Sequence, residues 1–474
     1  MKKIKMSLSL FVLLFGFQAL NAQEGIKISV QVDGYTNNEA YLAYYYADKM
    51  YVRDTVQKNE QGVMVFQTEE AIPGGIYLVV FPPDNNYFQI LLKEGNESFT
   101  LRTTYPDLIT NMSIEGNDDN ALFYEYLKFI GQQTPIAQEL KKRYAEASEE
   151  ERPEIEKQQE EIDEIVKAYQ LNITENYPNT FAATVIKANM PFDMPEIEGE
   201  TEEVKQKAQL DWIRTHYFDN IDLADPNMIR TPFFFEKVNY FLKTFYAQHP
   251  DSIGSALVRV LDAMEPAKEN FQFFLVHYLN EYAKSNIVGM DAVYVYLVDN
   301  YYANGRAPWT DSTQLEKIIE NANGLKPTLI GKIAPDIRLE RKDETNFNLH
   351  DVNAKYTVLY FWRFDCGHCQ ESTPVVKKFY ETFKDRGVKL VAVCTKFTDD
   401  VKGCWDYIEE NEIEDWMHGV DTYHRSKYME KYYIKSTPQI FILDQDKKII
   451  IKKIGSEQLE DVMSSLIENE AINK

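Results

Sequence analysis

Cysteine is scarce in this chain of 474 residues, and its placement is uneven. There are only four cysteines, and all of them lie after residue 360. A small scaffold held together by disulfides needs many cysteines spread along its length. The sequence therefore excludes such a scaffold, and it predicts that any thiol chemistry is confined to the C-terminal part.

Positive charge is also in short supply. The chain has 51 Lys and Arg against 75 Asp and Glu, which gives a net charge of -24, and no segment is strongly basic. Nucleic acids are bound by clustered lysine and arginine, so a nucleic-acid partner is not expected. With 44% hydrophobic residues the chain can bury a sizeable core, and its length predicts two to four domains.

Long apolar runs are missing except near the N-terminus. Three lysines in the first five residues precede a short apolar segment, Leu8 to Leu20, which is too short to span a membrane. Residues 1–22 are therefore predicted to be a secretory signal peptide that is cleaved after Ala22. No cysteine follows Ala22, so no lipid anchor is expected. We expect the mature protein in the periplasm or cell envelope, without a transmembrane anchor.

The remaining chain divides into three predicted regions. In residues 23–117, apolar residues alternate with polar ones and turn signals separate short runs, which predicts a β-sandwich. Residues 118–326 show helical periodicity. Their first two helices, between residues 120 and 177, are predicted to form a solvated hairpin, with a dimerising coiled coil as the alternative. Residues 324–327 are interpreted as a linker.

Residues 331–474 alternate predicted strands with predicted helices, which is the α/β pattern. The fold class is therefore multidomain, with a β-sandwich, an α-helical region and a C-terminal α/β domain. The predicted elements of the last domain are strands at 357–362 and 388–394, helices at 370–383, 402–411 and 459–469, and a hairpin at 439–444 and 448–453.

The chemistry lies in the run Cys366-Gly367-His368-Cys369, which directly follows the first of these strands. Cys366 falls at the start of a helix, where unpaired backbone N–H groups and the helix dipole favour a thiolate. A protonated His368 would stabilise the same anion. Two cysteines separated by two residues can form a disulfide and reopen it. The motif therefore predicts a dithiol that exchanges disulfides.

Other uses of these cysteines fit less well. A structural zinc site would need two more ligands, and Cys394 and Cys404 do not repeat the C-x-x-C spacing. Covalent haem requires a histidine directly after the second cysteine, where this chain has Gln370. An inert disulfide is poorly placed at a helix N-terminus. No metal and no cofactor is predicted.

The last domain resembles the TlpA-like thiol–disulfide oxidoreductases of the thioredoxin superfamily over about 140 residues. The preceding region more weakly resembles the accessory domains found before such modules in some envelope proteins. The residues that carry the main resemblance are the opening motif at 331–336, Phe361-Trp362 before the C-x-x-C motif, Pro374 in the following helix, Thr437-Pro438 before a strand, and Gly455.

The resemblance implies a role for each site residue. Cys366 would be the attacking thiolate and Cys369 the resolving thiol, and the two would form a redox-active disulfide. Pro438 is expected to be cis and to face the dithiol, and the Thr437 backbone would pair with a bound substrate chain. Trp362 would pack beside the dithiol. Gly367 and His368 would tune it.

The chain also departs from the family pattern. Tyr360 replaces the buried acid of thioredoxin, and Ser372 replaces a glutamate of some TlpA-like reductases. Asp365 stands where a tryptophan often precedes the first cysteine, and its carboxylate would oppose the thiolate. Gly367-His368 replaces Gly-Pro and resembles protein disulfide isomerases, which would make the disulfide more oxidising.

Two alternatives concern the other residues of the domain. A peroxiredoxin shares the opening motif but needs Thr or Ser three residues before its reactive cysteine, where this chain has Arg363. Cys394 is interpreted as a small buried hydrophobic residue and Cys404 as more exposed. A second redox pair formed by these two cysteines is the alternative, because spacing alone cannot show contact.

The sequence thus predicts an extracytoplasmic thiol–disulfide oxidoreductase that acts on protein substrates and is favoured to be a reductase. It would need a membrane-bound or soluble redox partner. The alternatives are a disulfide oxidase or isomerase, and a binding protein whose redox domain only senses or locks a partner. The oligomeric state and the physiological substrate are not given by the sequence.

Overall fold

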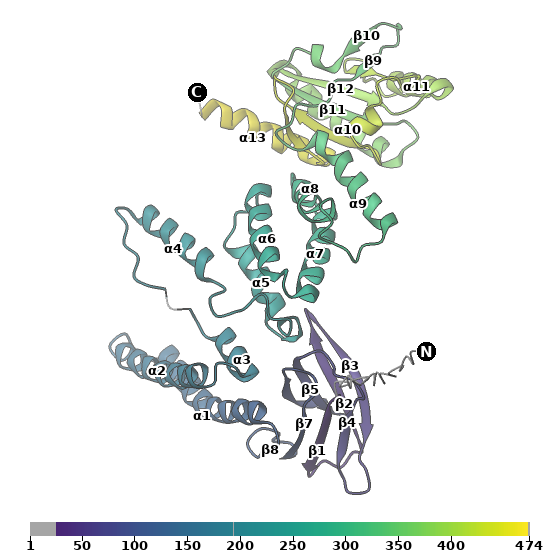
Figure 1. Ribbon diagram of the computed structural model, residues 1–474. Coiled ribbons are helices and arrows are strands. Elements are labelled where there is room, and N and C mark those ends of the chain that lie inside the picture. Colours follow the sequence, from purple (N-terminus) through teal and green to yellow (C-terminus); the bar gives the residue numbers. More distant parts are fainter. Residues whose placement is uncertain (1–24, 193, 473–474) are drawn as a thin grey trace, which may run out of the picture. The chain divides into compact units, whose positions relative to one another are not determined.

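The computed structural model describes residues 25–192 and 194–472 (Figure 1). The predicted signal peptide lies outside the described residues. Among the residues described, no helix is both long and apolar enough to cross a membrane. The chain forms two compact units, of which the first ends at Val238 and the second begins at Asn239. This division falls inside the helical region, whereas the domain boundaries drawn from the sequence, at residues 117 and 326, stay a prediction.

The first unit begins with eight strands in two four-stranded sheets, ordered β4-β1-β7-β8 and β3-β2-β5-β6. Alternate residues of β1 are buried, as the sequence predicts, because Ile28, Val30 and Val32 point to the same face. The face-to-face packing of a sandwich stays a prediction. The strands are β1 Lys27–Asp33, β2 Glu39–Tyr46, β3 Lys49–Gln57, β4 Met64–Gln67, β5 Gly75–Phe81, β6 Asn86–Leu92, β7 Ser98–Thr104 and β8 Ser113–Glu115.

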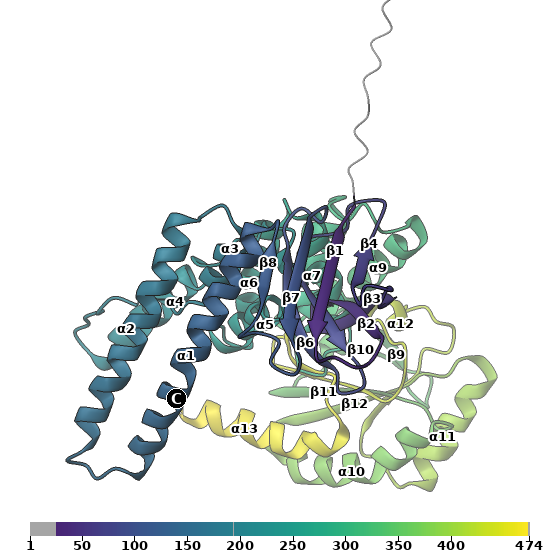
Figure 2. The ribbon, with the colours of Figure 1, turned by 90° about the horizontal axis from the view of Figure 1, so that it is seen from below.

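Two long helices follow, α1 (Asp118–Glu146) and α2 (Arg152–Asn176). They pack against each other as a helical hairpin, which both views of the ribbon show (Figures 1 and 2). The rings of Phe129 and Tyr169 stack across the hairpin with centroids 4.0 Å apart. The hairpin prediction is therefore confirmed. Helices α3 (Phe181–Asn189) and α4 (Glu202–His216) complete the described helices of this unit apart from α5, which crosses the unit boundary.

The helical part of the second unit ends in α9. Asp311 is the N-cap residue of this helix, and its side chain accepts a hydrogen bond from the Gln314 backbone N–H at 3.0 Å. The predicted linker at 324–327 is wrong, because α9 runs to Leu325 and a 3₁₀ turn continues from it. The helices are α5 Phe234–Thr244, α6 Pro250–Met264, α7 Lys268–Ala283, α8 Asp291–Leu297 and α9 Ser312–Leu325.

Gly324 explains why the linker prediction fails. The glycine lies within α9, and a Cβ atom placed on it would come within 2.3 Å of the Tyr433 ring. The missing side chain therefore allows close packing rather than flexibility. In the sequence, a glycine shortly before Lys326-Pro327 is typical of a linker. In the structure, Gly324 lies within α9 and contacts the Tyr433 ring.

The C-terminal part of the second unit is built on a five-stranded sheet ordered β13-β12-β11-β14-β15. The central strand β11 is parallel to β12 and antiparallel to β14, and β14 and β15 form the predicted hairpin. A separate two-stranded hairpin, β9-β10, was not predicted. The strands are β9 Arg338–Glu340, β10 Asn346–Asn348, β11 Tyr356–Trp362, β12 Val388–Cys394, β13 Met417–Gly419, β14 Gln439–Leu443 and β15 Ile449–Lys452.

Strand β11 is buried along its whole length because it faces two hydrophobic cores. Tyr360 and Trp362 lie in the core that α10 (Gly367–Phe383) covers, together with residues of α11 (Val401–Glu410) and α13 (Leu459–Ile472). Leu359 and Phe361 lie in the core on the other side, with residues of α12 (Tyr428–Lys431). The continuous apolar run in the sequence follows from this burial on both faces.

Candidate active site

The two cysteines of the motif lie at the junction between β11 and α10. Cys366 is the N-cap residue of α10, with extended backbone angles, and Cys369 lies in the first helical turn. The Cys366 side chain is partly accessible, whereas Cys369 is buried. Both are free thiols in this structure, so their predicted disulfide stays a prediction. The expected position at a helix N-terminus is confirmed.

The two thiols differ in acidity. Burial raises the pKa of Cys366, but hydrogen bonds with Cys369 and Thr437 and the charge of Arg363 outweigh it and leave the pKa below its ordinary value. Burial and the interaction with Cys366 raise the pKa of Cys369 to about 11. The pair therefore consists of one accessible thiol that ionises readily and one buried thiol that stays protonated at neutral pH.

The Thr437–Pro438 loop lies against the dithiol. Its peptide bond is cis, as predicted. The Cys366 thiol donates a hydrogen bond to the Thr437 carbonyl oxygen at 3.4 Å. This contact joins two segments that are 71 residues apart in the sequence. Pairing of the Thr437 backbone with a substrate chain stays a prediction.

His368 does not contact the dithiol in the way the motif suggests. Its side chain is 86% exposed, and Nδ1 lies 3.3 Å from Glu371 Oε2. The groups that lower the pKa of Cys366 are Cys369, Thr437 and Arg363. The tuning role of His368 stays a prediction, as does that of Gly367, which is exposed beside it.

The side chains beneath the dithiol are aromatic. Trp362 and Tyr360 are each 1% exposed and belong to the same buried cluster as Cys369. Burial raises the pKa of Tyr360 far above its ordinary value, so its hydroxyl is neutral at physiological pH. Ser372 donates a hydrogen bond to the His368 carbonyl oxygen at 2.7 Å. Neither replacement residue therefore offers a base that could take the proton of Cys369.

Three family models match this chain. The AhpC/TSA family model matches residues 330–452, and two domains of unknown function, DUF4369 and DUF5106, match residues 26–123 and 147–326. The thiol-disulfide oxidoreductase ResA of Bacillus cereus is 26% identical over 141 residues, which cover 29% of this chain and 78% of that protein. ResA of Oceanobacillus iheyensis is 32% identical over 88 residues, 18% of this chain and 45% of that protein.

The C-terminal domain belongs to the TlpA-like branch of the thioredoxin superfamily. It is a thioredoxin-like thiol–disulfide oxidoreductase domain. Among solved structures, a domain of a possible thiol-disulfide isomerase from Cytophaga hutchinsonii is similar, with 32% identity over 31% of this chain and 99% of that chain and a TM-score of 0.29. A thioredoxin-like protein from Bacteroides caccae is 16% identical over 58% of this chain and 99% of that chain, with a TM-score of 0.44.

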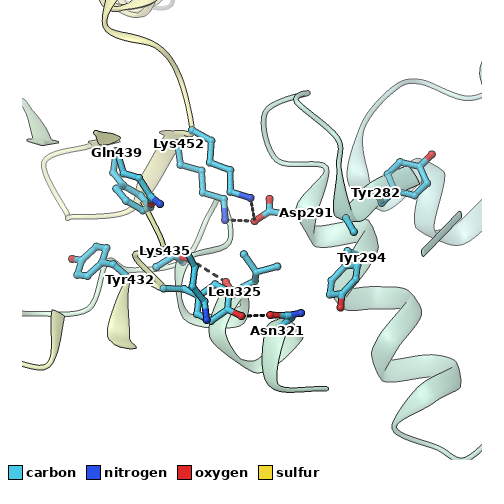
Figure 3. A pocket seen from close by; sticks show the side chains of 14 residues that line it. Tyr282, Asp291, Tyr294, Asn321, Leu325, Tyr432, Lys435, Gln439 and Lys452 are labelled. Carbon is cyan, nitrogen blue, oxygen red and sulfur yellow. Dashed lines mark hydrogen bonds and ion pairs between the residues drawn. The ribbon is translucent and has the colours of Figure 1, made fainter. Parts of the chain in front are cut away.

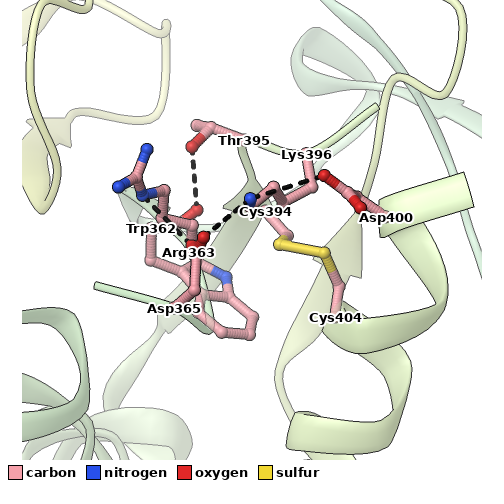
Figure 4. The surroundings of a disulfide bond; sticks show 8 residues. All are labelled: Trp362, Arg363, Asp365, Cys394, Thr395, Lys396, Asp400 and Cys404. Atoms are coloured by element: carbon pink, nitrogen blue, oxygen red, sulfur yellow. Dashed lines mark hydrogen bonds and ion pairs between the residues drawn. A yellow bond between two sulfur atoms is a disulfide. The ribbon is translucent and has the colours of Figure 1, made fainter. Parts of the chain in front are cut away.

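The carboxylate of Asp365 in the TlpA-like domain is paired with two cations. Its expected opposition to the neighbouring thiolate stays a prediction. Arg363 Nε lies 3.2 Å from Oδ1, and Lys396 Nζ lies 2.8 Å from Oδ2 (Figure 4). The hydrogen bond from Lys396 lowers the pKa of Asp365. The acid is therefore ionised, and the pKa of Cys366 is nevertheless lowered.

The other two cysteines of the TlpA-like domain are bonded to each other. Cys394, the last residue of β12, and Cys404, in the first turns of α11, form a disulfide (Figure 4). Both are buried, with exposed fractions of 1% and 0%. The expected burial of Cys394 is confirmed, whereas the expectation that Cys404 is more exposed is wrong. The alternative that pairs these two cysteines is borne out as a bond, and its redox activity stays a prediction. Because contact between a strand end and a helix is a property of the fold, the spacing could not show it.

Metal chemistry receives no support from the described part of the chain. Within it, no group of three or more His, Cys, Asp or Glu side chains is placed to hold a metal ion. The site residues that the structure brings together are Cys366, Cys369, Trp362, Thr437 and Pro438. Arg363 and Lys396 belong beside them and were not identified as site residues from the sequence.

Proposed function

We propose that this protein is an extracytoplasmic thiol–disulfide oxidoreductase that reduces disulfides of protein substrates through Cys366 and Cys369. The observation that carries the proposal is the unequal acidity of the two thiols beside the Thr437–Pro438 loop. An accessible thiolate can attack, and a buried thiol is kept back for the second step.

The reaction consists of two thiol–disulfide exchanges. The Cys366 thiolate attacks one sulfur of a substrate disulfide, the substrate S–S bond breaks, and a mixed disulfide forms while the other substrate sulfur leaves as a thiolate. Cys369 then loses its proton and attacks Cys366 Sγ. The mixed disulfide breaks, the second substrate thiolate leaves, and the Cys366–Cys369 disulfide forms. Two electrons have passed to the substrate.

In the second step a base must take the proton of Cys369. The first step lowers the pKa of Cys369, so a weaker base is sufficient. The hydrogen bond with Cys366 and its charge both contribute to the raised pKa of Cys369. Once Cys366 is in the mixed disulfide, it carries no charge, and both contributions end. The pKa of Cys369 then falls, so the departing substrate thiolate can accept its proton.

A complete cycle requires that the Cys366–Cys369 disulfide be reduced again. The electrons must come from an external dithiol, either a soluble protein or one in the membrane, and two electrons restore both thiols. The opposite direction, as an oxidase or isomerase, is the second candidate. The lowered pKa of Cys366 favours it, because a stabilised thiolate stabilises the reduced form.

The deciding measurement is the reduction potential of the Cys366–Cys369 couple in a glutathione buffer. A value of roughly -270 mV supports a reductase, and a value near roughly -180 mV or above supports an oxidase or isomerase. A couple that cannot be cycled would favour the binding protein, in which the redox domain only senses or locks a partner.

Substitution of each cysteine tests the assignment of roles. Cys366→Ser is expected to abolish the acceleration of insulin reduction that the wild-type protein gives in the presence of dithiothreitol. Cys369→Ser is expected to retain the attack and to accumulate a mixed disulfide with insulin, visible on a non-reducing gel. Each variant is the control for the other, since both remove one thiol. Full exchange activity in Cys366→Ser would contradict the proposal.

The location outside the cytoplasm rests on residues 1–22 and is tested separately. Mass spectrometry of the protein from cell-envelope fractions is expected to find an N-terminus at Gln23. A protein that keeps Met1 and stays in the cytoplasmic fraction would contradict this part of the proposal without affecting the exchange chemistry.

A further inference from the structure

The ion pair between Asp365 and Lys396 has one fixed member and one more exposed member. The Lys396 side chain is 17% exposed, whereas that of Asp365 is 42% exposed. Most ion pairs on a protein surface contribute little because both side chains are free to move. A lysine that is held in place avoids much of this entropy cost, so its effect on the neighbouring carboxylate is larger.

The segment that carries Lys396 is held at both ends. Thr395 donates from its backbone N–H and from Oγ1 to the Trp362 carbonyl oxygen, at 2.7 and 3.2 Å. This contact continues the pairing of β12 with β11 by one residue. The disulfide between Cys394 and Cys404 then ties the end of β12 to α11. Lys396 thus lies inside the loop that the disulfide closes between two cysteines 10 positions apart in the sequence.

Further contacts place the same loop against the segment before Cys366. Lys396 Nζ lies 5.2 Å from the centre of the Phe364 ring and 3.5 Å from Asp400 Oδ2. A Cβ atom on Gly403 would come within 2.5 Å of the Phe364 ring, so only glycine lets α11 approach this closely. The Phe364 ring therefore packs directly against α11 at Gly403, so the helix lies against the segment that leads to Cys366.

We propose that Lys396 is a positioning residue of the dithiol site, and that the Cys394–Cys404 disulfide holds it where it neutralises Asp365. The second disulfide then supports the reactivity of Cys366 without itself changing oxidation state. This inference rests on the proposed role of Cys366 as the attacking thiol. Cys369, Thr437 and Arg363 also act on Cys366, and the proposal leaves their contributions unchanged.

The test measures the ionisation of Cys366 directly. The protein is treated with limited dithiothreitol, mass spectrometry verifies that Cys394–Cys404 is intact, and iodoacetamide labelling of Cys366 is followed against pH. Lys396→Met is expected to raise the apparent pKa of Cys366 by about half a unit, which is about a threefold loss of labelling rate at pH 7. The matched control is Lys402→Met, which replaces an exposed lysine on α11. It should change neither the apparent pKa of Cys366 nor its labelling rate.

A double-mutant cycle separates the route through Asp365 from a direct effect of the lysine charge. In an Asp365→Asn background, Lys396→Met is expected to shift the labelling profile little, because no carboxylate is left to neutralise. A shift of the same size in both backgrounds would overturn the positioning role.

The disulfide is tested with Cys394→Ala/Cys404→Ala. This variant is expected to reproduce the shift of Lys396→Met, and adding Lys396→Met to it should change little more. If the variant is folded by circular dichroism and its Cys366 profile is that of wild type, the role of the disulfide is refuted. If the double variant does not fold, Asp400→Asn is measured in its place. It keeps the disulfide and removes one contact of Lys396, so a smaller shift in the apparent pKa of Cys366 is expected.

Failure of this inference can be distinguished from failure of the proposed function. Labelling by iodoacetamide requires no substrate protein and no turnover. A protein that shows the predicted shifts but does not reduce insulin would refute the function and leave the positioning role standing. If the protein reduces insulin and Lys396→Met does not shift the apparent pKa of Cys366, the positioning role is refuted and the proposed function stands.

A cavity in the second unit supplies a separate observation (Figure 3). It encloses about 300 Å³ and is lined by residues of α7, α8 and α9 and of the TlpA-like domain. This volume is at the lower end of small-molecule sites. Its most buried charged residue is Lys452, whose side chain is 1% exposed and whose Nζ lies 2.5 Å from Asp291 Oδ2. Burial lowers the pKa of Lys452.

Positive charge is in excess in this cavity, although the chain as a whole is acidic. Lys435, Lys452 and Lys453 line it, and Asp291 is its only acidic lining residue. The same carboxylate oxygen of Asp291 lies near two of these lysines, at 2.5 Å from Lys452 Nζ and 3.9 Å from Lys453 Nζ. Lys435 Nζ lies 4.3 Å from the centre of the Tyr433 ring. A single carboxylate thus leaves an unbalanced positive charge.

The remaining walls are largely aromatic rings. Tyr282, Tyr294, Tyr432 and Tyr433 line the cavity. Three of their hydroxyls are already used, since Tyr294 donates to the Ile318 carbonyl, Tyr432 to the Pro335 carbonyl and Tyr433 to Asn321 Oδ1. Tyr294 and Tyr432 are almost fully buried, so the half-buried rings of Tyr282 and Tyr433 supply most of the flat apolar surface.

The geometry points to a binding site for a small organic anion that carries a flat ring. The lysines would hold the anionic group, and the tyrosine rings would cover the ring of the ligand. This site does not depend on the oxidation state of the dithiol or on the proposed exchange reaction.

Two fluorescent probes with the same rings test the site on the full-length protein. 8-Anilinonaphthalene-1-sulfonate carries an anionic group, and N-phenyl-1-naphthylamine does not. The sulfonate is expected to bind saturably, and Lys435→Gln and Lys453→Gln are each expected to weaken it about fivefold, with little effect on the neutral probe. Lys448→Gln, an exposed lysine nearby that does not line the cavity, is the control. No saturable sulfonate binding, or equal affinity in all variants, would overturn the site.

Discussion

At Cys366, three neighbours act on a thiol that burial alone would keep protonated. Cys369 and Thr437 hydrogen-bond to it, and Arg363 contributes positive charge. His368, which the C-G-H-C motif suggests as the main stabilising group, is exposed and lies beside Glu371. The motif predicted the position of the thiols, but it could not predict which neighbours would reach them. Those neighbours come from other parts of the fold.

The coupling between the two thiols gives a prediction for Cys369. In Cys366→Ala the hydrogen bond and the charge of Cys366 are lost, so the pKa of Cys369 should fall from about 11 by roughly one unit. It should stay above its ordinary value, because burial remains the largest cause of the shift. Thiolate absorbance at 240 nm against pH measures it. An unchanged pKa would mean that the first exchange step does not activate the resolving thiol.

At the scale of single elements, the longer strands and helices were predicted from the sequence and the shortest ones were not. The strand β11 and the helix α10 were predicted because the apolar run from Val358 to Trp362 leads directly into the C-x-x-C motif, which is typical of a helix start. The strands β9, β10 and β13 were missed, since three residues carry too little periodicity to be recognised. The Cys394–Cys404 disulfide was only an alternative, because sequence spacing cannot show that the end of β12 contacts α11. The ion pair of Lys396 with Asp365 was missed, because it joins two segments that only the fold brings together.

Strand β13 carries a histidine that makes stability depend on pH. His418 is buried, its Nε2 donates to the Ile413 carbonyl oxygen at 2.7 Å, and burial lowers its pKa to about 4. The unfolded chain binds a proton near pH 6.5, whereas the folded protein does not until the pH is far lower. Stability from this residue is therefore complete above pH 6.5 and is lost as the pH falls toward 4.

The expected loss is about 2 kcal/mol between pH 7 and pH 5. Urea unfolding followed by tryptophan fluorescence at both pH values measures it, because Trp416 stacks on His418. The loss should be much smaller in His418→Gln. His249→Gln replaces an exposed histidine and should behave like wild type. An equal pH dependence in all three proteins would show that His418 is not responsible.

At the scale of the whole chain, the sequence families and the compact units divide the protein differently. The family models end one region at residue 326 and begin the next at 330, whereas the second unit extends from Asn239 to the C-terminus. The buried pair of Asp291 and Lys452 joins these two regions within that unit. The sequence indicated a change near residue 326 from helical periodicity to alternating strands and helices, but not the contacts between the two regions.

This pair predicts that the last helices and the TlpA-like domain unfold together. Asp291→Asn leaves the buried Lys452 without its counter-charge and is expected to cost about 3–5 kcal/mol. Asp299→Asn removes the partner of Lys326 in an exposed pair and should cost less than about 1 kcal/mol. Hydrogen exchange should show that Asp291→Asn lowers protection in both α8 and β15. Loss of protection in α8 alone would show that the two regions unfold separately.

The positions of the four cysteines also bear on how the chain matures. Ribosomes synthesise a chain from its N-terminus, so residues 1–365, which contain no cysteine, are made before the four cysteines. Cys366 and Cys369 then appear together, followed by Cys394 and Cys404, which are bonded to each other. Neither pair encloses a cysteine of the other. Pairing in order of emergence therefore joins Cys394 to Cys404, its partner in the structure, without any wrong pairing having to be undone.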